Sequence, residues 1–145
     1  MTQSSLRHFL TITDVSPAEL RSLIRRAAAF KRYRALGRRL LAGRTVALVF
    51  QKPSMRTRVS FEVAVLELGG AVVYLGQDDI QLGKREPVKD VARVLSGYVD
   101  GIVARTFRHQ QVEEFARYAT VPVINGLSER HHPCQAVADL FTMHE

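Results

Sequence analysis

The chain has 145 residues, 46% of them hydrophobic and 24% charged, which is the composition of one ordinary globular domain. No apolar run approaches the roughly 18 residues of a membrane helix, and the first residues, MTQSSLRHFL, do not form the apolar segment of a secretory signal. The single cysteine, Cys134, excludes an internal disulfide, so the sequence predicts a cytoplasmic protein.

The formal net charge of +7 resides in the first segment of the chain. Residues 1–44 contain ten Lys or Arg and two Asp or Glu, whereas residues 45–145 contain eleven and twelve. A basic helix can bind RNA or DNA, or it can be a solvated surface whose charge is balanced elsewhere. No aromatic platform or nucleic-acid motif accompanies the arginines, which favours the solvated surface. An Arg-rich mitochondrial transit peptide is a third interpretation, which Asp14 and Glu19 weaken.

Five segments have apolar residues at helical spacing. In the first, Ser16 is a good N-cap, Pro17 suits the first helical position and Glu19 completes a capping box. Gly37 or Gly43 is expected to end this helix. The other four helices are predicted from about residue 56 to the glycines at 69–70, over 87–98, over 110–119 and over 132–145.

Four short apolar segments alternate with these helices and predict buried strands at 45–50, 71–75, 100–106 and 121–125. Strands that are apolar on both faces belong to a parallel sheet covered by helices. We therefore predict an α/β fold, a parallel sheet of about four strands with helices on both faces in three layers. Polar and basic residues follow every strand. Because ligands bind beyond the carboxyl ends of parallel strands, we expect the functional site at that edge.

The turn after the first strand gathers Ser54, Met55, Arg56 and Thr57 where a helix begins. Free backbone N–H groups and the positive end of the helix face such a turn, and hydroxyl and guanidinium groups would complete a phosphate cradle. Taken alone, the same residues also fit a helix N-cap with surface arginines. The Gly-rich pattern of a Walker loop is absent.

Three stretches resemble the aspartate/ornithine carbamoyltransferase family. KPSMRTRVSFE (52–62) is similar to its carbamoyl-phosphate signature, usually Ser-Thr-Arg-Thr-Arg, and HPCQAVADL (132–140) is similar to its His-Pro-x-Gln signature. The segment between them, 78–106, is similar to the ornithine-type form of the family. The similarity spans essentially the whole chain, with both motifs in the family's order and spacing.

The resemblance implies a carbamoyl-phosphate site. Ser54, Arg56 and Thr57 match phosphate ligands, and the backbone at Met55 also contributes. Threonine is usual at position 55, so methionine removes a hydroxyl group but keeps the backbone N–H. Phosphate binding should survive this departure from the family pattern.

The same resemblance assigns the carbamoyl end of the substrate. Arg105 matches the arginine that bridges the phosphate and the carbonyl oxygen, and His132 matches the histidine that hydrogen-bonds that oxygen. Gln135 matches the group that holds the carbamoyl nitrogen, beside the carbonyl of Pro133. Negative charge grows on the carbamoyl oxygen during transfer, so Arg105, Thr57 and His132 are the expected catalytic donors.

Gln81 matches a residue that reaches the phosphate of a neighbouring subunit, so the resemblance implies a shared site and a trimer-based homo-oligomer. Lys84 and Arg85 in the same loop can meet an anion. An exposed surface loop is the alternative interpretation.

Each assignment has a simpler alternative. His132 could cap the last helix, Arg105 could pair with Glu86 or Asp100, and Cys134 is expected to be a packing residue. Carbamoyl transfer needs no metal and no covalent intermediate, and the chain contains no HExxH, CxxC or paired-carboxylate spacing. We therefore expect neither a metal nor a cofactor.

The resemblance implies a transferase of arginine biosynthesis that uses carbamoyl phosphate and L-ornithine to give L-citrulline and phosphate. Residues 1–145 would be the carbamoyl-phosphate-binding domain, with the acceptor-binding domain absent and the isolated domain inactive. Aspartate or N-acylornithine carbamoyl transfer is the alternative within the family. A non-catalytic phosphate-ligand or nucleic-acid-binding module is the alternative outside it; we expect no nucleic-acid or membrane partner.

Overall fold

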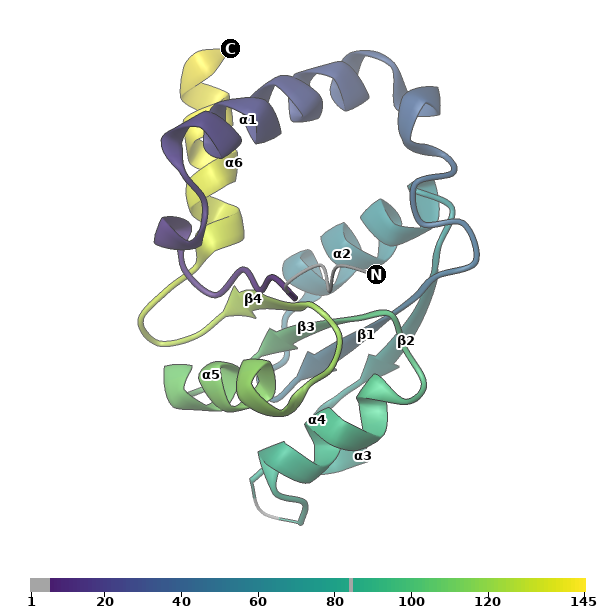
Figure 1. The fold of residues 1–145 in the computed structure, drawn as a ribbon, viewed down its shortest axis with the longest axis vertical. Helices are drawn as coiled ribbons and strands as arrows, with labels where there is room; N and C mark the ends of the chain where they lie inside the picture. The colour runs from purple at the N-terminus through teal and green to yellow at the C-terminus, as the bar shows by residue number, and fades with distance from the viewer. Residues whose placement is uncertain (1–5, 84) are drawn as a thin grey trace.

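The computed structural model describes residues 6–83 and 85–145, which fold around a four-stranded parallel sheet (Figure 1). The strands are β1 (Thr45–Phe50), β2 (Ala71–Leu75), β3 (Gly101–Arg105) and β4 (Val123–Leu127). Their spatial order is β2-β1-β3-β4, and every neighbouring pair is parallel. The predicted α/β fold with about four strands is confirmed.

Helices cover both faces of the sheet, and α1 and α6 lie farther out on the side of α2 (Figure 1). On the opposite face lie α4 and α5. No helix in the described ranges is long and apolar enough to cross a membrane. The helices are α1 (Pro17–Arg32), α2 (Met55–Glu67), α3 (Gln77–Ile80), α4 (Val88–Ser96), α5 (His109–Tyr118) and α6 (Pro133–His144), with short 3-10 helices at Ile12–Asp14 and Arg34–Gly37.

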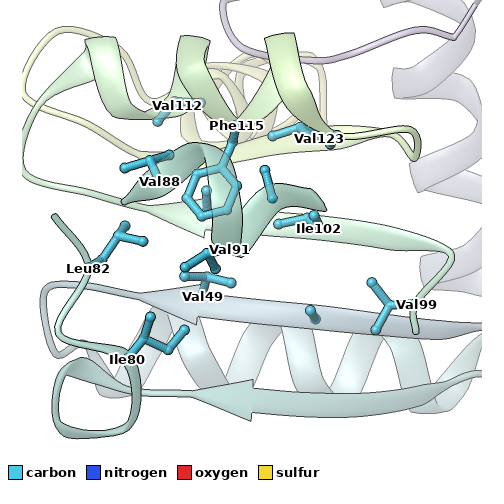
Figure 2. Close-up of a cluster of buried hydrophobic side chains, with 14 residues drawn as sticks. Val49, Ile80, Leu82, Val88, Val91, Val99, Ile102, Val112, Phe115 and Val123 are labelled. Carbon is cyan, nitrogen blue, oxygen red and sulfur yellow. The ribbon is translucent and has the colours of Figure 1, made fainter. Parts of the chain in front are cut away.

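Alternate residues of β1 point to two separate cores. Ala47 and Val49 pack with α4 and α5, where Phe115 is fully buried (Figure 2). Leu48 and Phe50 face the other way, with Val103 and partly buried residues such as Phe61 of α2. A strand buried on both faces reads as continuously apolar, as the sequence of β1 does.

The first helix begins as predicted. Ser16 Oγ accepts a hydrogen bond from the Glu19 N–H (3.3 Å), and the Glu19 carboxylate accepts one from the Ser16 N–H (2.8 Å). The expected end at Gly37 or Gly43 is wrong, because α1 ends at Arg32. Gly37 has another role: a Cβ there would lie 2.6 Å from Leu68 Cδ2, so any larger residue would require the Leu68 side chain at the end of α2 to shift.

The fourth strand begins two residues later than predicted. Pro122 has no N–H to donate, and pairing with β3 starts at Val123 and reaches Leu127, with a shift of register between Ala104 and Arg105. Phe9 pairs with the outer side of this strand: its N–H donates to the Val123 carbonyl and its carbonyl accepts from the Asn125 N–H, both at 2.8 Å. The chain's first described segment therefore covers one edge of the sheet.

Candidate functional site

Six of the nine predicted site residues line one cavity of about 610 Å³ at the carboxyl edge of the sheet. It lies between β1 and β3, where the strand order reverses and ligands of such sheets bind. None of the residues lining this cavity is acidic. The six residues are Ser54, Arg56, Thr57, Arg105, His132 and Gln135.

Two helices begin at this cavity. Ser54 is the N-cap of α2 and His132 is the N-cap of α6, and residues of the first turn of each helix line the cavity wall. The first N–H groups of a helix have no partner within it, and the helix dipole places partial positive charge there. Both helix starts therefore favour a bound anion.

The Thr57 hydroxyl is the centre of the hydrogen bonding in the cavity. Its oxygen accepts from Ser54 Oγ at 3.1 Å and from Arg105 Nη1 at 3.0 Å. A hydroxyl oxygen has two lone pairs and one proton. Because both lone pairs are used, the Thr57 proton is free to be donated to a ligand.

Two further donors sit in low-dielectric surroundings. Arg105 Nε is buried without a hydrogen-bond partner among the described residues, and burial lowers the pKa of this guanidinium. Burial, and secondly the charge of Arg105, lowers the pKa of His132, whose imidazole is therefore neutral at pH 7. Burial also raises the pKa of Cys134 to about 11, so its thiol stays protonated, as a packing residue requires.

Three predicted residues lie outside the cavity lining. Met55 is 74% exposed at the first position of α2, and Pro133 is buried at the first position of α6. Gln81 has a left-handed backbone (φ 47°) and lines a second cavity, of about 810 Å³, that contains Asp78 and Glu114. Within one chain, Gln81 is thus not brought to the other eight residues.

The structure also tests the simpler roles considered for Arg105 and His132. Asp100 binds Arg44 at 2.5 Å, and Arg105 binds Thr57 instead. His132 does cap α6 by position, but its side chain forms no cap hydrogen bond. Lys84 lies outside the described residues. No group of three metal-binding side chains occurs within residues 6–83 and 85–145.

Sequence reasoning missed the residues that hold the loops of the site. Gln51 donates from Nε2 to the Leu82 carbonyl (3.1 Å) and accepts at Oε1 from the Phe107 N–H (2.9 Å), so one side chain joins two strand exits. A polar side chain directly after an apolar strand was the available signal. The loop before His132 is held by His109, Asn125 and Ser128, which are described below.

Comparison with known proteins shows which family the chain belongs to. Residues 7–145 match the domain described as "Aspartate/ornithine carbamoyltransferase, carbamoyl-P binding domain". The chain belongs to this family.

The similar proteins include an ornithine carbamoyltransferase of Acidothermus cellulolyticus, 54% identical over 97% of this chain and 45% of the relative. A crystal structure of anabolic ornithine carbamoyltransferase from Campylobacter jejuni is 45% identical with a TM-score of 0.90, over 96% of this chain and 45% of that one. Ornithine carbamoyltransferase from Pyrococcus furiosus is 51% identical with a TM-score of 0.89, over 94% and 44%. The chain therefore spans less than half the length of these carbamoyltransferases.

Proposed function

We propose that this chain is the carbamoyl-phosphate-binding half of an ornithine carbamoyltransferase, which transfers the carbamoyl group to L-ornithine and releases L-citrulline and phosphate. One observation carries the proposal: Thr57, Arg105 and His132 direct hydrogen-bond donors into an acid-free cavity onto which two helices open. The names of the similar proteins support ornithine as the acceptor and arginine biosynthesis as the pathway.

The mechanism follows from the positive and neutral hydrogen-bond donors that line the cavity. Arg56, Ser54 and the start of α2 hold the phosphate, while Arg105, the Thr57 proton and His132 meet the carbamoyl oxygen. The lone pair of a neutral amine forms the new bond to the carbamoyl carbon, and negative charge grows on the oxygen. The carbon–oxygen bond to phosphate then breaks, phosphate leaves with that electron pair, and the proton that the amine loses passes to the departing phosphate.

Gln135 and the carbonyl of Pro133 hold the carbamoyl nitrogen, which fixes the plane of the group before attack. Asp139 accepts from Gln135 Nε2 at 2.7 Å, and this contact leaves the Gln135 amide oxygen for the carbamoyl NH₂. Holding the two reactants in line supplies much of the remaining acceleration. No described residue of the chain is assigned to the acceptor, which a second domain would bind.

The separation of Gln81 from the cavity supports a site shared between subunits of a homo-oligomer, built on trimers. Gln81 is exposed directly after α3, where it is accessible to a neighbouring chain. The lone, unreactive cysteine supports a cytoplasmic location.

Titration calorimetry of residues 1–145 with carbamoyl phosphate tests the proposal. We expect weak binding, and little or no citrulline formation when ornithine is added, because the acceptor half is not present. A short oligonucleotide is the comparison ligand for the basic first segment. Binding of the oligonucleotide without carbamoyl phosphate would favour a nucleic-acid module, and efficient citrulline synthesis would contradict the need for a second domain.

A further inference from the structure

A buried polar cluster lies behind the loop that carries His132 to the cavity. It consists of His109 at the start of α5, Asn125 in β4, and Ser128 just after β4. Their residues are 4%, 0% and 5% exposed. Polar groups this deeply buried are costly unless they are hydrogen-bonded, so their partners show what the cluster holds in place.

The Ser128 hydroxyl joins the cluster to the loop. Its shortest contact, 2.9 Å, is to Nδ1 of His109, and we assign its single proton to this bond rather than to the more distant His131 carbonyl at 3.4 Å. Its oxygen is then free to accept from the His131 N–H at 3.3 Å. The assignment requires a neutral His109 with its proton on Nε2, which lies 3.8 Å from a carboxylate oxygen of Glu113.

The backbone of His131 is held on both sides by this cluster. Its carbonyl accepts from the Ser128 N–H at 3.0 Å and from Asn125 Nδ2 at 3.2 Å, which uses both lone pairs. Its N–H donates to Ser128 Oγ, and its ring packs edge-on against His109 with 4.7 Å between centroids. His131 itself is exposed at its surface, so these contacts fix a backbone position rather than fill a core.

The next residue is His132. Because the backbone N–H and the carbonyl of His131 are both hydrogen-bonded, the backbone that leads into α6 has little conformational freedom. His132 Nδ1 is buried without a hydrogen-bond partner among the described residues, so no contact of its own ring nitrogen holds this side chain. Its place in the cavity depends on the backbone that precedes it.

We infer that Ser128 and His109 are positioning residues, which fix the backbone of His131 and thereby hold the His132 imidazole inside the anion cavity. The consequence for carbamoyl-phosphate binding rests on the proposed function. The placement of His132 does not, and it is measurable without a ligand.

The readout is the pKa of the His132 imidazole, followed by NMR of the 145-residue chain with labelled histidine. Burial and the nearby Arg105 lower this pKa in the folded protein. A His132 that swings into water should titrate near the ordinary value of about 6.5. A His132→Gln variant assigns the signal.

Four variants separate positioning from general destabilisation. Ser128→Ala removes the hydroxyl, and His109→Leu removes its acceptor. His109→Asn offers an amide oxygen close to the position of Nδ1 and should rescue the contact. Ser96→Ala is the matched control: Ser96 Oγ also makes two backbone contacts, to the Ala92 carbonyl at 2.7 Å and from the Thr120 N–H at 3.0 Å, but away from the cavity.

We expect the His132 pKa to rise toward 6.5 in Ser128→Ala and His109→Leu, and to keep its wild-type value in His109→Asn and Ser96→Ala. An unchanged His132 pKa in folded Ser128→Ala would overturn the inference. If Ser128→Ala does not fold, the two His109 variants decide, and equal values in them would also overturn it.

Titration with carbamoyl phosphate and with inorganic phosphate then separates the inference from the proposed function. We expect Ser128→Ala to bind carbamoyl phosphate between about twofold and tenfold more weakly than the wild type, the equivalent of the one hydrogen bond from His132, and to bind inorganic phosphate, which lacks the carbamoyl oxygen, as the wild type does. If the wild-type chain binds neither phosphate nor carbamoyl phosphate, the proposed function fails, while the His132 titration still decides whether Ser128 positions that residue.

Discussion

Arg105 connects the sheet to the chemistry of the cavity at the scale of one residue. Its carbonyl accepts from the Gln51 N–H at 2.8 Å, which fixes the exits of β1 and β3 side by side. Its guanidinium donates to Thr57 and keeps one buried donor, Nε, without a partner among the described residues. The same positive charge helps to hold the neighbouring imidazole of His132 neutral.

This electrostatic coupling gives a first prediction. Arg105→Gln should raise the pKa of His132, because a positive neighbour that disfavours the imidazolium is removed; burial, the larger cause, remains, so the value should stay below 6.5. NMR titration of the imidazole measures it. Arg93→Gln, on the exposed side of α4, is the charge-matched control and should leave His132 unchanged. A lower His132 pKa in Arg105→Gln would show that the guanidinium does not act on it as a charge.

A second prediction contrasts two neighbouring residues at the start of α2. Arg56→Ala should weaken phosphate-ligand binding by at least about 30-fold, since loss of a charge-assisted contact costs roughly 2–5 kcal/mol. Met55→Thr should change it little, because the Met55 side chain is 74% exposed and its expected contribution is the backbone N–H. Calorimetric titration with carbamoyl phosphate compares both with the wild type. Near-normal affinity in Arg56→Ala would mean that the phosphate lies elsewhere.

At the scale of elements, the sequence predicts whatever depends on local spacing. The strands at 45–50 and 71–75 and the capping box of α1 appear where expected, because burial and capping leave a local pattern. The start of β4 differs because it depends on pairing with a strand distant in sequence, and the end of α1 differs because the chain leaves the helix at Tyr33, with no glycine or proline to mark it. The sequence does not predict the one-turn helix α3, because its four residues are too few to show a helical spacing of apolar side chains.

The residues of the candidate site also differ in how far the sequence predicts them. Residues in continuous motifs, such as Ser54 and His132, could be predicted with the help of family resemblance. The contacts of Gln51 and Ser128 could not be predicted, because their partners lie up to 56 residues away and many are backbone atoms that no spacing rule identifies. That Gln81 lines a different cavity could likewise be learned only from the folded structure.

The packing of α5 on the sheet gives a third prediction. Phe115 is fully buried between α5 and the strands (Figure 2), so Phe115→Ala should lower the free energy of unfolding by about 3–5 kcal/mol. Tyr98→Ala is the control, because its side chain is 81% exposed and its loss should stay within about 0.5 kcal/mol. Urea titration followed by circular dichroism measures both. Equal losses would mean that α5 does not pack as described.

At the scale of the whole molecule, the proposed sharing of the site between subunits gives a fourth prediction. In the full-length protein, Gln81→Ala and His132→Ala subunits should each be nearly inactive alone and should regain activity when mixed under exchange conditions. Some sites of a mixed oligomer then combine an intact His132 with an intact Gln81 from the neighbour. Mixing two His132→Ala preparations is the control. If subunits exchange and no activity returns, Gln81 serves its own chain.

The pairing of Phe9 with β4 sets the order in which the protein can be completed during synthesis. Leu10 and Asn125, which are bonded through the Asn125 side chain, lie 115 residues apart in sequence. Closing so long a loop is entropically costly, so this contact forms after the local strand–helix units. At ribosomal speed the first segment waits roughly 6–23 s for β4 to be made. Because Asn125 also holds His131, the His132 end of the cavity becomes ordered only after β4 has been made.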